Sequence, residues 1–419
     1  MARILRDFKL LVKKGFLHIF GANFINKIIN FGIAIVLPRI ISRNLFGDFT
    51  YAQTILNTFL LLQGLGTVPA ILQYCSETKD ELKKISYLKY GVKIGIISNL
   101  CICFFIVLFS IFGNLSIEGS RKILLYLSIF PIFSIVFEDI QVYLRVLFQN
   151  KKFSILSTTN TLLYFLGTIL LGLLFSISGI ISAKYISYTL SIILGIAFIK
   201  EYIVNFFKVD YPNKDEKKNF LKFSIIASIT NAISQLLFQL DILLIGNLIK
   251  DTSIIATYKI ATLLPMNMLF LPSSIMIFVY PYFAKNSNDK NWIKEKYIKL
   301  QKYLLFINGF ISTFCILFAP FIIKIVFGNG YLDSVNAFRI LWIGYFIAGT
   351  FRIPSGNILF NIKKTKVNFY NSIITGVLNI ILDIVLILNF GYNGAAIATV
   401  ISFAISSIIS NVYLHKYLK

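Results

Sequence analysis

The sequence predicts an all-α polytopic membrane protein of about twelve transmembrane helices, in two six-helix lobes related by a parallel internal repeat. Three observations predict this fold. The mean hydropathy is +0.77, with 57% hydrophobic and only 14% charged residues. Apolar runs of about 20 residues, the length that crosses a bilayer, recur along the chain. The short segments between them are alternately rich and poor in Lys and Arg. A water-soluble chain of 419 residues would need far more polar surface.

The apolar runs are long enough to be helices, whereas a membrane β-barrel would show short alternating segments. They predict spans at 16–38, 46–73, 90–113, 122–146, 153–176, 180–204, 219–247, 254–282, 301–325, 334–360, 366–389 and 392–414.

Basic residues predict the orientation, because cytoplasmic loops retain positive charge. Of the 41 Lys and Arg, 30 lie in the N-terminal tail, in alternate loops and at the C-terminus. An even number of spans with cytoplasmic termini, in the plasma (inner) membrane, accounts for this pattern. Basic loops beside anionic lipid headgroups also account for the net charge of +23, so nucleic-acid binding is not expected.

The longest polar interruption separates two halves that resemble each other. TYAQTIL at 50–56 matches TYKIATL at 257–263, LFQNKK at 147–152 matches LFNIKK at 359–364, and GIISAKYIS at 179–187 matches GAAIATVIS at 394–402. The predicted organisation is a lead-in at 1–15, an N-lobe at 16–204, a linker at 205–218, a C-lobe at 219–414 and a tail at 415–419.

Parallel repeats of this kind typically place a substrate site at the seam between two lobes that rock against each other. No loop is long enough for a soluble catalytic domain, so no catalytic residues are expected. The four cysteines form no CxxC pair, and neither a metal site nor a cofactor is predicted.

Polar side chains inside the predicted spans are costly and therefore mark candidate sites. In the first span they recur at helical spacing on one face, and the seventh, eighth and tenth spans add amides and cations. The candidate substrate-binding residues are Asn23, Asn26, Lys27, Asn30, Gln235, Gln239, Lys259 and Arg352. Inward-facing amides also bond neighbouring helices for purely structural reasons, and that alternative stays open.

Three acids inside the predicted spans are candidates for ion coupling or for lining a cavity: Glu138, Asp241 and Asp383. A carboxyl in such surroundings can take up a coupling H⁺ or Na⁺. Glu138 can instead form a structural ion pair with Arg145, two turns later. Cations in a low dielectric attract phosphate and amides bond sugar hydroxyls, so the cavity would hold a phosphorylated, sugar-bearing headgroup whose lipid tail stays in the bilayer.

Three segments resemble the polysaccharide flippases of the multidrug/oligosaccharidyl-lipid/polysaccharide exporter superfamily, including the O-antigen type. They are LPRIISRNLFGDFTYAQTI at 37–55, QLDILLIGNL followed by ATYKIAT at 239–262, and NIILDIVLILNFGYNGAAIATVIS at 379–402. Ile41–Ser42 and Ala256 depart from the family pattern. The resemblance implies a two-lobed, twelve-helix flippase for oligosaccharide linked to undecaprenyl diphosphate. Its partners would be that lipid-linked glycan, membrane lipids, and the glycan polymerase and chain-length machinery.

Two other functions are compatible with parts of the sequence. A drug or metabolite cation antiporter would share the scaffold, but basic residues inside the spans disfavour cationic substrates. A membrane glycan polymerase would need acids or His on a sizeable outer loop, whereas the outer loops here are short.

Overall fold

The computed structural model describes residues 16–202, 204, 206–286 and 288–418, and helices with short connections account for them without a strand. The predicted lead-in at 1–15 lies outside the described residues. The chain folds into two compact units, unit 1 up to Gln239 and unit 2 from Leu240 onward. This division falls within helix α9 (Lys214–Ile249), downstream of the predicted linker at 205–218.

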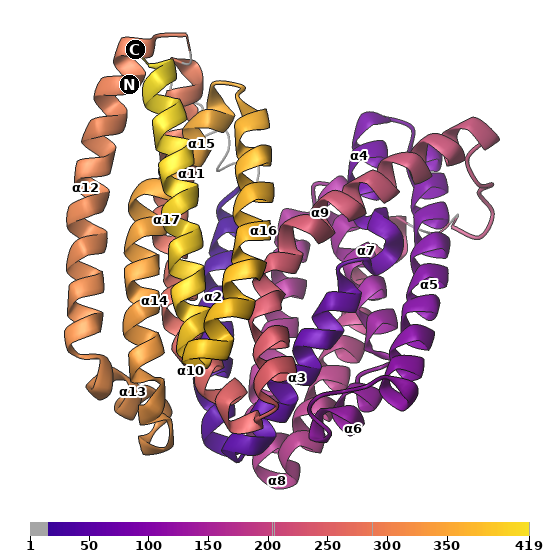
Figure 1. The fold of residues 1–419 in the computed structure, drawn as a ribbon. Helices are drawn as coiled ribbons and strands as arrows, with labels where there is room; N and C mark the ends of the chain where they lie inside the picture. The colour runs from indigo at the N-terminus through magenta and orange to yellow at the C-terminus, as the bar shows by residue number, and fades with distance from the viewer. Residues whose placement is uncertain (1–15, 203, 205, 287, 419) are drawn as a thin grey trace. The chain divides into compact units, whose positions relative to one another are not determined.

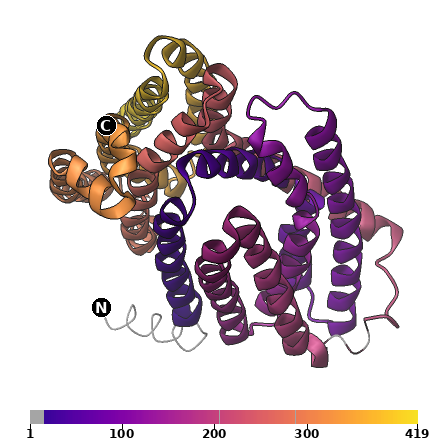
Figure 2. The same ribbon diagram turned by 90° about the horizontal axis from the view of Figure 1, so that it is seen from below.

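Unit 1 is a bundle in which α2 and α8 lie side by side, as Figure 2 shows. Its core joins α4, α5, α7 and α8 through buried aliphatic and aromatic side chains. Ser42 and Asp80 begin α3 and α5 as N-caps, accepting from the amides of Leu45 and Leu82. The elements are α2 (Phe16–Ile40), α3 (Arg43–Leu60), η1 (Gln63–Gly66), α4 (Thr67–Glu77), α5 (Glu81–Phe112), α6 (Gly119–Tyr126), α7 (Phe130–Val146), α8 (Asn150–Ile199), η2 (Lys200–Tyr202) and the first part of α9.

Unit 2 contains the end of α9 and the remaining helices, of which α16 and α17 pack along each other (Figure 1). Its core joins α11, α12, α15 and α17. Asp251 begins α10 by accepting from the amides of Ser253 and Ile254. The elements are α10 (Thr252–Met268), α11 (Phe270–Lys285), α12 (Lys290–Leu317), α13 (Ala319–Phe327), η3 (Asn329–Ser334), α14 (Val335–Ile347), the π-helical η4 (Ala348–Arg352), α15 (Ile353–Asn361), α16 (Thr365–Phe390) and α17 (Tyr392–Tyr417).

A sharp turn between two helices recurs in both units. In unit 1 the break within α8 is at Ser176, with φ 53° and ψ −131°, and in unit 2 the turn between α16 and α17 is at Gly391, with φ 60° and ψ −147°. These positions are 215 residues apart. Gly179 and Gly394, also 215 apart, each lie so close to a backbone carbonyl that a Cβ would clash with it. The third sequence match therefore corresponds to one repeated local structure.

The helix ends of α7 and α15 repeat each other in the same way. Phe148 and Lys363 adopt positive φ of 56° and 61°. The amide of the following residue donates five residues back, from Gln149 to the Leu144 carbonyl at 2.9 Å and from Lys364 to the Leu359 carbonyl at 2.8 Å. Both are Schellman caps. The same backbone geometry thus occurs at an offset of 215 residues, whereas the second sequence match pairs 147–152 with 359–364 at an offset of 212. The structural repeat is therefore shifted by three residues from that sequence match.

The helices confirm the predicted all-α, multi-pass membrane fold. Within the described residues, eight helical segments are long and apolar enough to cross a membrane, and α6 with α7, bent by 44°, adds a ninth if counted as one span. The break within α8 is at Ser176, where the predicted span at 153–176 ends and shortly before the one at 180–204 begins. Several other predicted spans consist of two shorter helices, so the count of twelve stays a prediction.

Candidate functional site

Unit 2 holds a cluster of polar side chains around Asp241, near the end of α9. The Tyr258 hydroxyl of α10 donates to Asp241 Oδ2 at 2.5 Å. The Thr399 hydroxyl of α17 donates to the same oxygen at 3.0 Å. The consecutive helices α9 and α10 and the distant helix α17 therefore meet at one carboxyl group.

The Asp383 carboxyl of α16 completes this cluster, because it interacts electrostatically with Asp241. Asp383 is fully buried, and apart from its interaction with Asp241 neither of its carboxyl oxygens has a hydrogen-bond partner among the described residues. The Nδ2 atom of Asn379, one turn earlier on α16, is also buried without a described partner. We call Asp241, Asp383, Tyr258, Thr399 and Asn379 the acid cluster.

The acid cluster has the chemistry of a site for a proton or a hard cation. Two carboxylates close together in a low dielectric repel each other strongly, so they are stable only when a proton or a cation is shared between them. Carboxylate, hydroxyl and amide oxygens are the ligands that hard cations prefer. Asp241, Asp383, Thr399 and Asn379 supply such oxygens from three helices.

Unit 1 has a lysine at the corresponding position of its repeat. Lys184 on α8 lies 215 residues before Thr399, the offset of the repeated turns. Its ammonium nitrogen is 3.1 Å from the Gln53 side-chain oxygen and 4.1 Å from the centroid of the Phe130 ring. Gln53 in turn donates to Asn57 at 3.0 Å. At this position of the repeat, unit 1 has the ammonium group of Lys184, whereas unit 2 has the Thr399 hydroxyl, which donates to a carboxylate.

The predicted acid Glu138 lies on α7 of unit 1, where it is partly buried and interacts with Gln63. Its neighbour Asp139 is 3% exposed, and neither oxygen of its carboxyl group has a described hydrogen-bond partner. Arg145 is exposed and lies 5.8 Å from the Phe153 ring centroid. No ion pair joins Glu138 to Arg145 in the described structure, so the structural ion-pair alternative is not supported.

The predicted cations lie in separate helices. Lys27 is exposed on α2 in unit 1. In unit 2, Lys259 is partly buried on α10, and Arg352 ends the π-helical η4 with its guanidinium 4.9 Å from the Phe403 ring centroid. Among the described residues, no ion pair or hydrogen bond joins the side chain of Lys259 or Arg352 to the acid cluster, although Lys259 follows Tyr258 directly in the chain.

The predicted amides are at least partly exposed. Asn23 and Asn30 are exposed on α2, whereas Asn26 donates to the Ser157 hydroxyl of α8 at 2.8 Å. For Asn26 this bond fits the structural alternative, in which an inward-facing amide joins two neighbouring helices. Gln235 is exposed and Gln239 is partly buried on α9.

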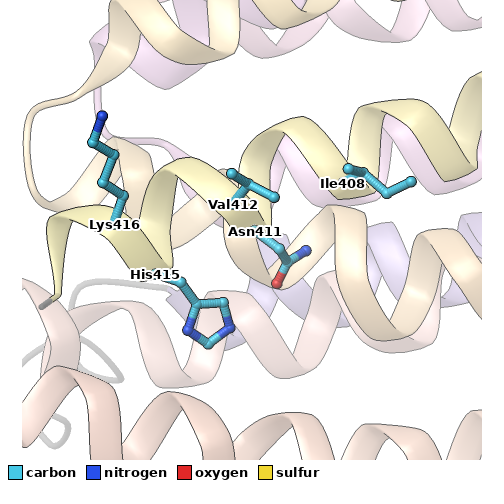
Figure 3. Close-up of a pocket in the computed structure, with 5 residues that line it drawn as sticks. All are labelled: Ile408, Asn411, Val412, His415 and Lys416. Carbon is cyan, nitrogen blue, oxygen red and sulfur yellow. The ribbon is translucent and has the colours of Figure 1, made fainter.

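A groove of about 540 Å³ lies elsewhere, along the last three turns of α17 (Figure 3). It is lined by Ile408, Asn411, Val412, His415 and Lys416, none of which was predicted as a site residue. Asn411 accepts from the Tyr297 hydroxyl at 2.5 Å and from Gln301 at 2.9 Å, which ties α17 to α12. These bonds give the polar part of the groove a structural role.

Sequence reasoning missed three members of the acid cluster as well as Lys184. Asn379 shares a helical stripe with Asp383, so its spacing was a usable signal. Tyr258 and Thr399 occur in the repeated motifs, but only tertiary packing brings them to Asp241. Lys184 lies near the start of the predicted span at 180–204 and was not among the predicted site residues; in the structure it lies two turns into the helix that follows Ser176.

A family model described as polysaccharide biosynthesis protein matches residues 12–287 of the chain. The capsular polysaccharide biosynthesis protein CapF of Staphylococcus aureus is 23% identical over 413 residues, which cover 96% of this chain and 99% of CapF. The probable low-salt glycan biosynthesis flippase Agl15 of Haloferax volcanii is 26% identical over 213 residues, 50% of this chain and 44% of Agl15.

Solved structures of transporters share the fold. The lipid II flippase MurJ, in an inward closed conformation, matches with a TM-score of 0.73 at 21% identity, covering 95% of this chain and 87% of MurJ. An inward-facing multidrug resistance MATE family transporter of the MOP superfamily matches with a TM-score of 0.73 at 14% identity, covering 94% of each chain. At these identities the likeness shows the fold alone.

Proposed function

Because this chain belongs to the polysaccharide biosynthesis protein family, we propose that it is a flippase for oligosaccharide repeat units linked to undecaprenyl diphosphate. It moves them from the inner to the outer leaflet of the plasma membrane by alternating access. It is a multi-pass membrane transporter and not an enzyme. CapF matches along nearly its whole length, and the partial relative Agl15 carries the name of a glycan flippase. A glycan polymerase and chain-length machinery would act on the product.

The observation that carries this proposal is the set of charged and amide side chains inside otherwise apolar helices of a chain from this family. Lys27, Lys259 and Arg352 supply positive charge for a diphosphate, and the amides of α2 and α9 supply donors and acceptors for sugar hydroxyls. A membrane-embedded charge costs about 2.5–3.5 kcal/mol on insertion scales, so a functional role accounts for retaining several of them.

Coupling to H⁺ or Na⁺ is the second part of the proposal, and the acid cluster supports it. Asp241, Asp383, Thr399 and Asn379 would hold the ion. The bound ion would supply positive charge that lets the two carboxyl groups remain close in a low dielectric. Tyr258 orients Asp241 by donating its hydroxyl proton to Oδ2.

The test uses a strain that lacks this chain and expresses variants from a plasmid. We expect Lys27→Gln, Lys259→Gln and Arg352→Gln each to lower surface glycan by about tenfold, the effect of losing roughly 1.4 kcal/mol of binding. Lys151→Gln, at the exposed start of α8, is the matched control and should retain full glycan. Lipid-linked repeat units should accumulate in the inner leaflet.

Other outcomes would reject the assignment. Accumulation of single repeat units in the outer leaflet would indicate a polymerase. Drug sensitivity of the deletion strain with normal surface glycan would indicate an antiporter. Full activity of all three variants would show that transport does not need these three cations. The flippase function itself would then be tested by the leaflet in which repeat units accumulate.

A further inference from the structure

Three lysines of unit 1 converge on one tyrosine ring. The ammonium nitrogens of Lys89 and Lys93 on α5 lie 5.0 and 5.1 Å from the centroid of the Tyr211 ring, and that of Lys217 on α9 lies 5.5 Å away. Lys217 also lies 5.9 Å from the ring of Tyr90, which packs edge-on against Tyr211 at 6.3 Å. We call these five residues the lysine–tyrosine cluster.

The segment that carries Tyr211 is fixed to α5 by hydrogen bonds from two α5 side chains to its backbone carbonyls. Lys89 Nζ donates to the carbonyls of Val209 at 2.8 Å and Phe207 at 3.2 Å. The Ser86 hydroxyl donates to the Asp210 carbonyl at 2.7 Å. Tyr211 is therefore held in place independently of the two other lysines, Lys93 and Lys217.

The cluster carries uncompensated positive charge. The first turn of α9 carries two acids, Asp215 and Glu216, and Glu216 is engaged by Lys83 at 2.6 Å. Across the described residues, no carboxylate lies within ion-pair distance of any of the three cluster lysines. Like charges gathered around one ring repel each other, so this arrangement favours an anion between Lys93 and Lys217.

An apolar stripe leads away from the cluster along α5. Ile97, Leu100 and Phe104 follow Lys93 at i+4, i+7 and i+11, and these spacings place all four on one face of the helix. The three apolar side chains are 49%, 50% and 60% exposed, and α5 is long and apolar enough to cross a membrane. The cluster thus lies where the charged start of α5 changes to a lipid-facing surface.

We propose that the lysine–tyrosine cluster binds the phosphate of an anionic phospholipid. Lys93 and Lys217 donate charge-assisted hydrogen bonds to the phosphate oxygens, and the Tyr211 hydroxyl provides a further donor. The acyl chains lie along Ile97, Leu100 and Phe104, which a soluble anion would not use. Lys89 is a positioning residue, since it holds the segment that carries Tyr211.

This site does not depend on the proposed transport function. A bound lipid would tie the segment at 206–213, which connects α8 with α9, more firmly to α5. The expected consequence is that anionic lipid stabilises the folded protein more than zwitterionic lipid does.

The experiment titrates the purified full-length protein in detergent with phosphatidylglycerol and counts bound lipids by native mass spectrometry. The unfolding midpoint is recorded in parallel. We expect Lys93→Gln combined with Lys217→Gln to weaken binding by about thirty-fold, at about 1 kcal/mol per lysine. Tyr211→Leu, which keeps every lysine, should also weaken it. The matched control is Lys208→Gln with Lys218→Gln, two exposed neighbours outside the cluster.

Three results would overturn the proposal. An equal loss in the control double variant would mean that binding follows overall charge. Equal affinity for phosphatidylcholine would show that the site does not recognise the net negative charge of the headgroup. Binding of inorganic phosphate or pyrophosphate that competes with the lipid and depends equally on the cluster would assign the site to a soluble anion instead.

Discussion

The two carboxyl groups of the acid cluster are the residues on which ion coupling depends in the proposed function. Asp383→Asn replaces a fully buried carboxyl group, which can bind a proton or a cation, by an amide of the same shape. We expect glycan flipping in proteoliposomes to lose its dependence on a Na⁺ or proton gradient, and Asp241→Asn should do the same. Asp210→Asn, in the exposed segment before α9, should leave the dependence unchanged. A gradient response that survives in both cluster variants would contradict this role.

Glu216 is a residue whose ionisation contributes to stability at the start of α9. A hydrogen bond from Lys83 is the main cause that holds the pKa of Glu216 below its usual range. Glu216 also accepts from the Asn213 amide at 3.1 Å, while Asn213 Oδ1 accepts from the Glu216 amide at 2.9 Å. This reciprocal pair is a capping box.

Glu216→Gln keeps the capping atoms and removes the charge. Because the folded pKa is lowered, the ion pair stabilises the protein fully above the unfolded pKa of about 4.3 and loses its effect as pH falls through the folded value. We expect the free energy of unfolding of the wild type to exceed that of the variant by less than about 1 kcal/mol at pH 7. This difference should fade below pH ~4.3. Thermal unfolding between pH 7 and 3 measures it, and Asp215→Asn is the control. A difference that persists at pH 3 would rule out the charge as its cause.

The residues of the candidate site were partly predictable from sequence. A charge or amide inside an apolar run is visible in the sequence, and this identified Asp241 and Asp383 separately. Their meeting, and the bonds from Tyr258 and Thr399, depend on the packing of α9, α10, α16 and α17, which no local pattern encodes. Lys184 was missed because a basic residue near a span end resembles an interfacial anchor.

At the scale of elements, the repeated turn leaves no room for a side chain at Gly179 or at Gly394. A Cβ at 394 would collide with the Leu386 carbonyl, and one at 179 with the Leu171 carbonyl. We expect Gly394→Ala to destabilise the protein by roughly 1–3 kcal/mol, the usual cost of forcing backbone to shift. Detergent unfolding curves test this. Gly309→Ala is the control, because a Cβ there meets only Phe346 at 3.6 Å.

Hydropathy predicted where helices occur but not where they break. The run at 334–360 reads as one span, yet it contains α14, the π-helical η4 and α15. Ser176 adopts positive φ where its counterpart in unit 2 is a glycine, so residue type alone did not mark that turn. Such breaks depend on backbone packing rather than on the transfer energy that hydropathy measures.

At the scale of the whole molecule, the fold class was predictable because the solvent imposes it: a chain this apolar must satisfy its backbone internally in lipid. The orientation is a separate prediction, derived from 30 basic residues in alternate segments. It places the exposed Lys208 on the cytoplasmic side and the exposed Asn329, at the start of η3, on the outer side.

Cysteine labelling in cells tests this orientation. A membrane-impermeant maleimide should label Asn329→Cys in intact cells, but label Lys208→Cys only after permeabilisation. The native cysteines should give little background, since Cys75 and Cys103 are buried and Cys101 and Cys315 lie within the apolar helices α5 and α12. Labelling of both variants from outside would place an even number of crossings between them, instead of the three predicted. Labelling of Lys208→Cys alone would show that the orientation is the opposite of the predicted one. The proposed direction of glycan transport would then lose its topological basis.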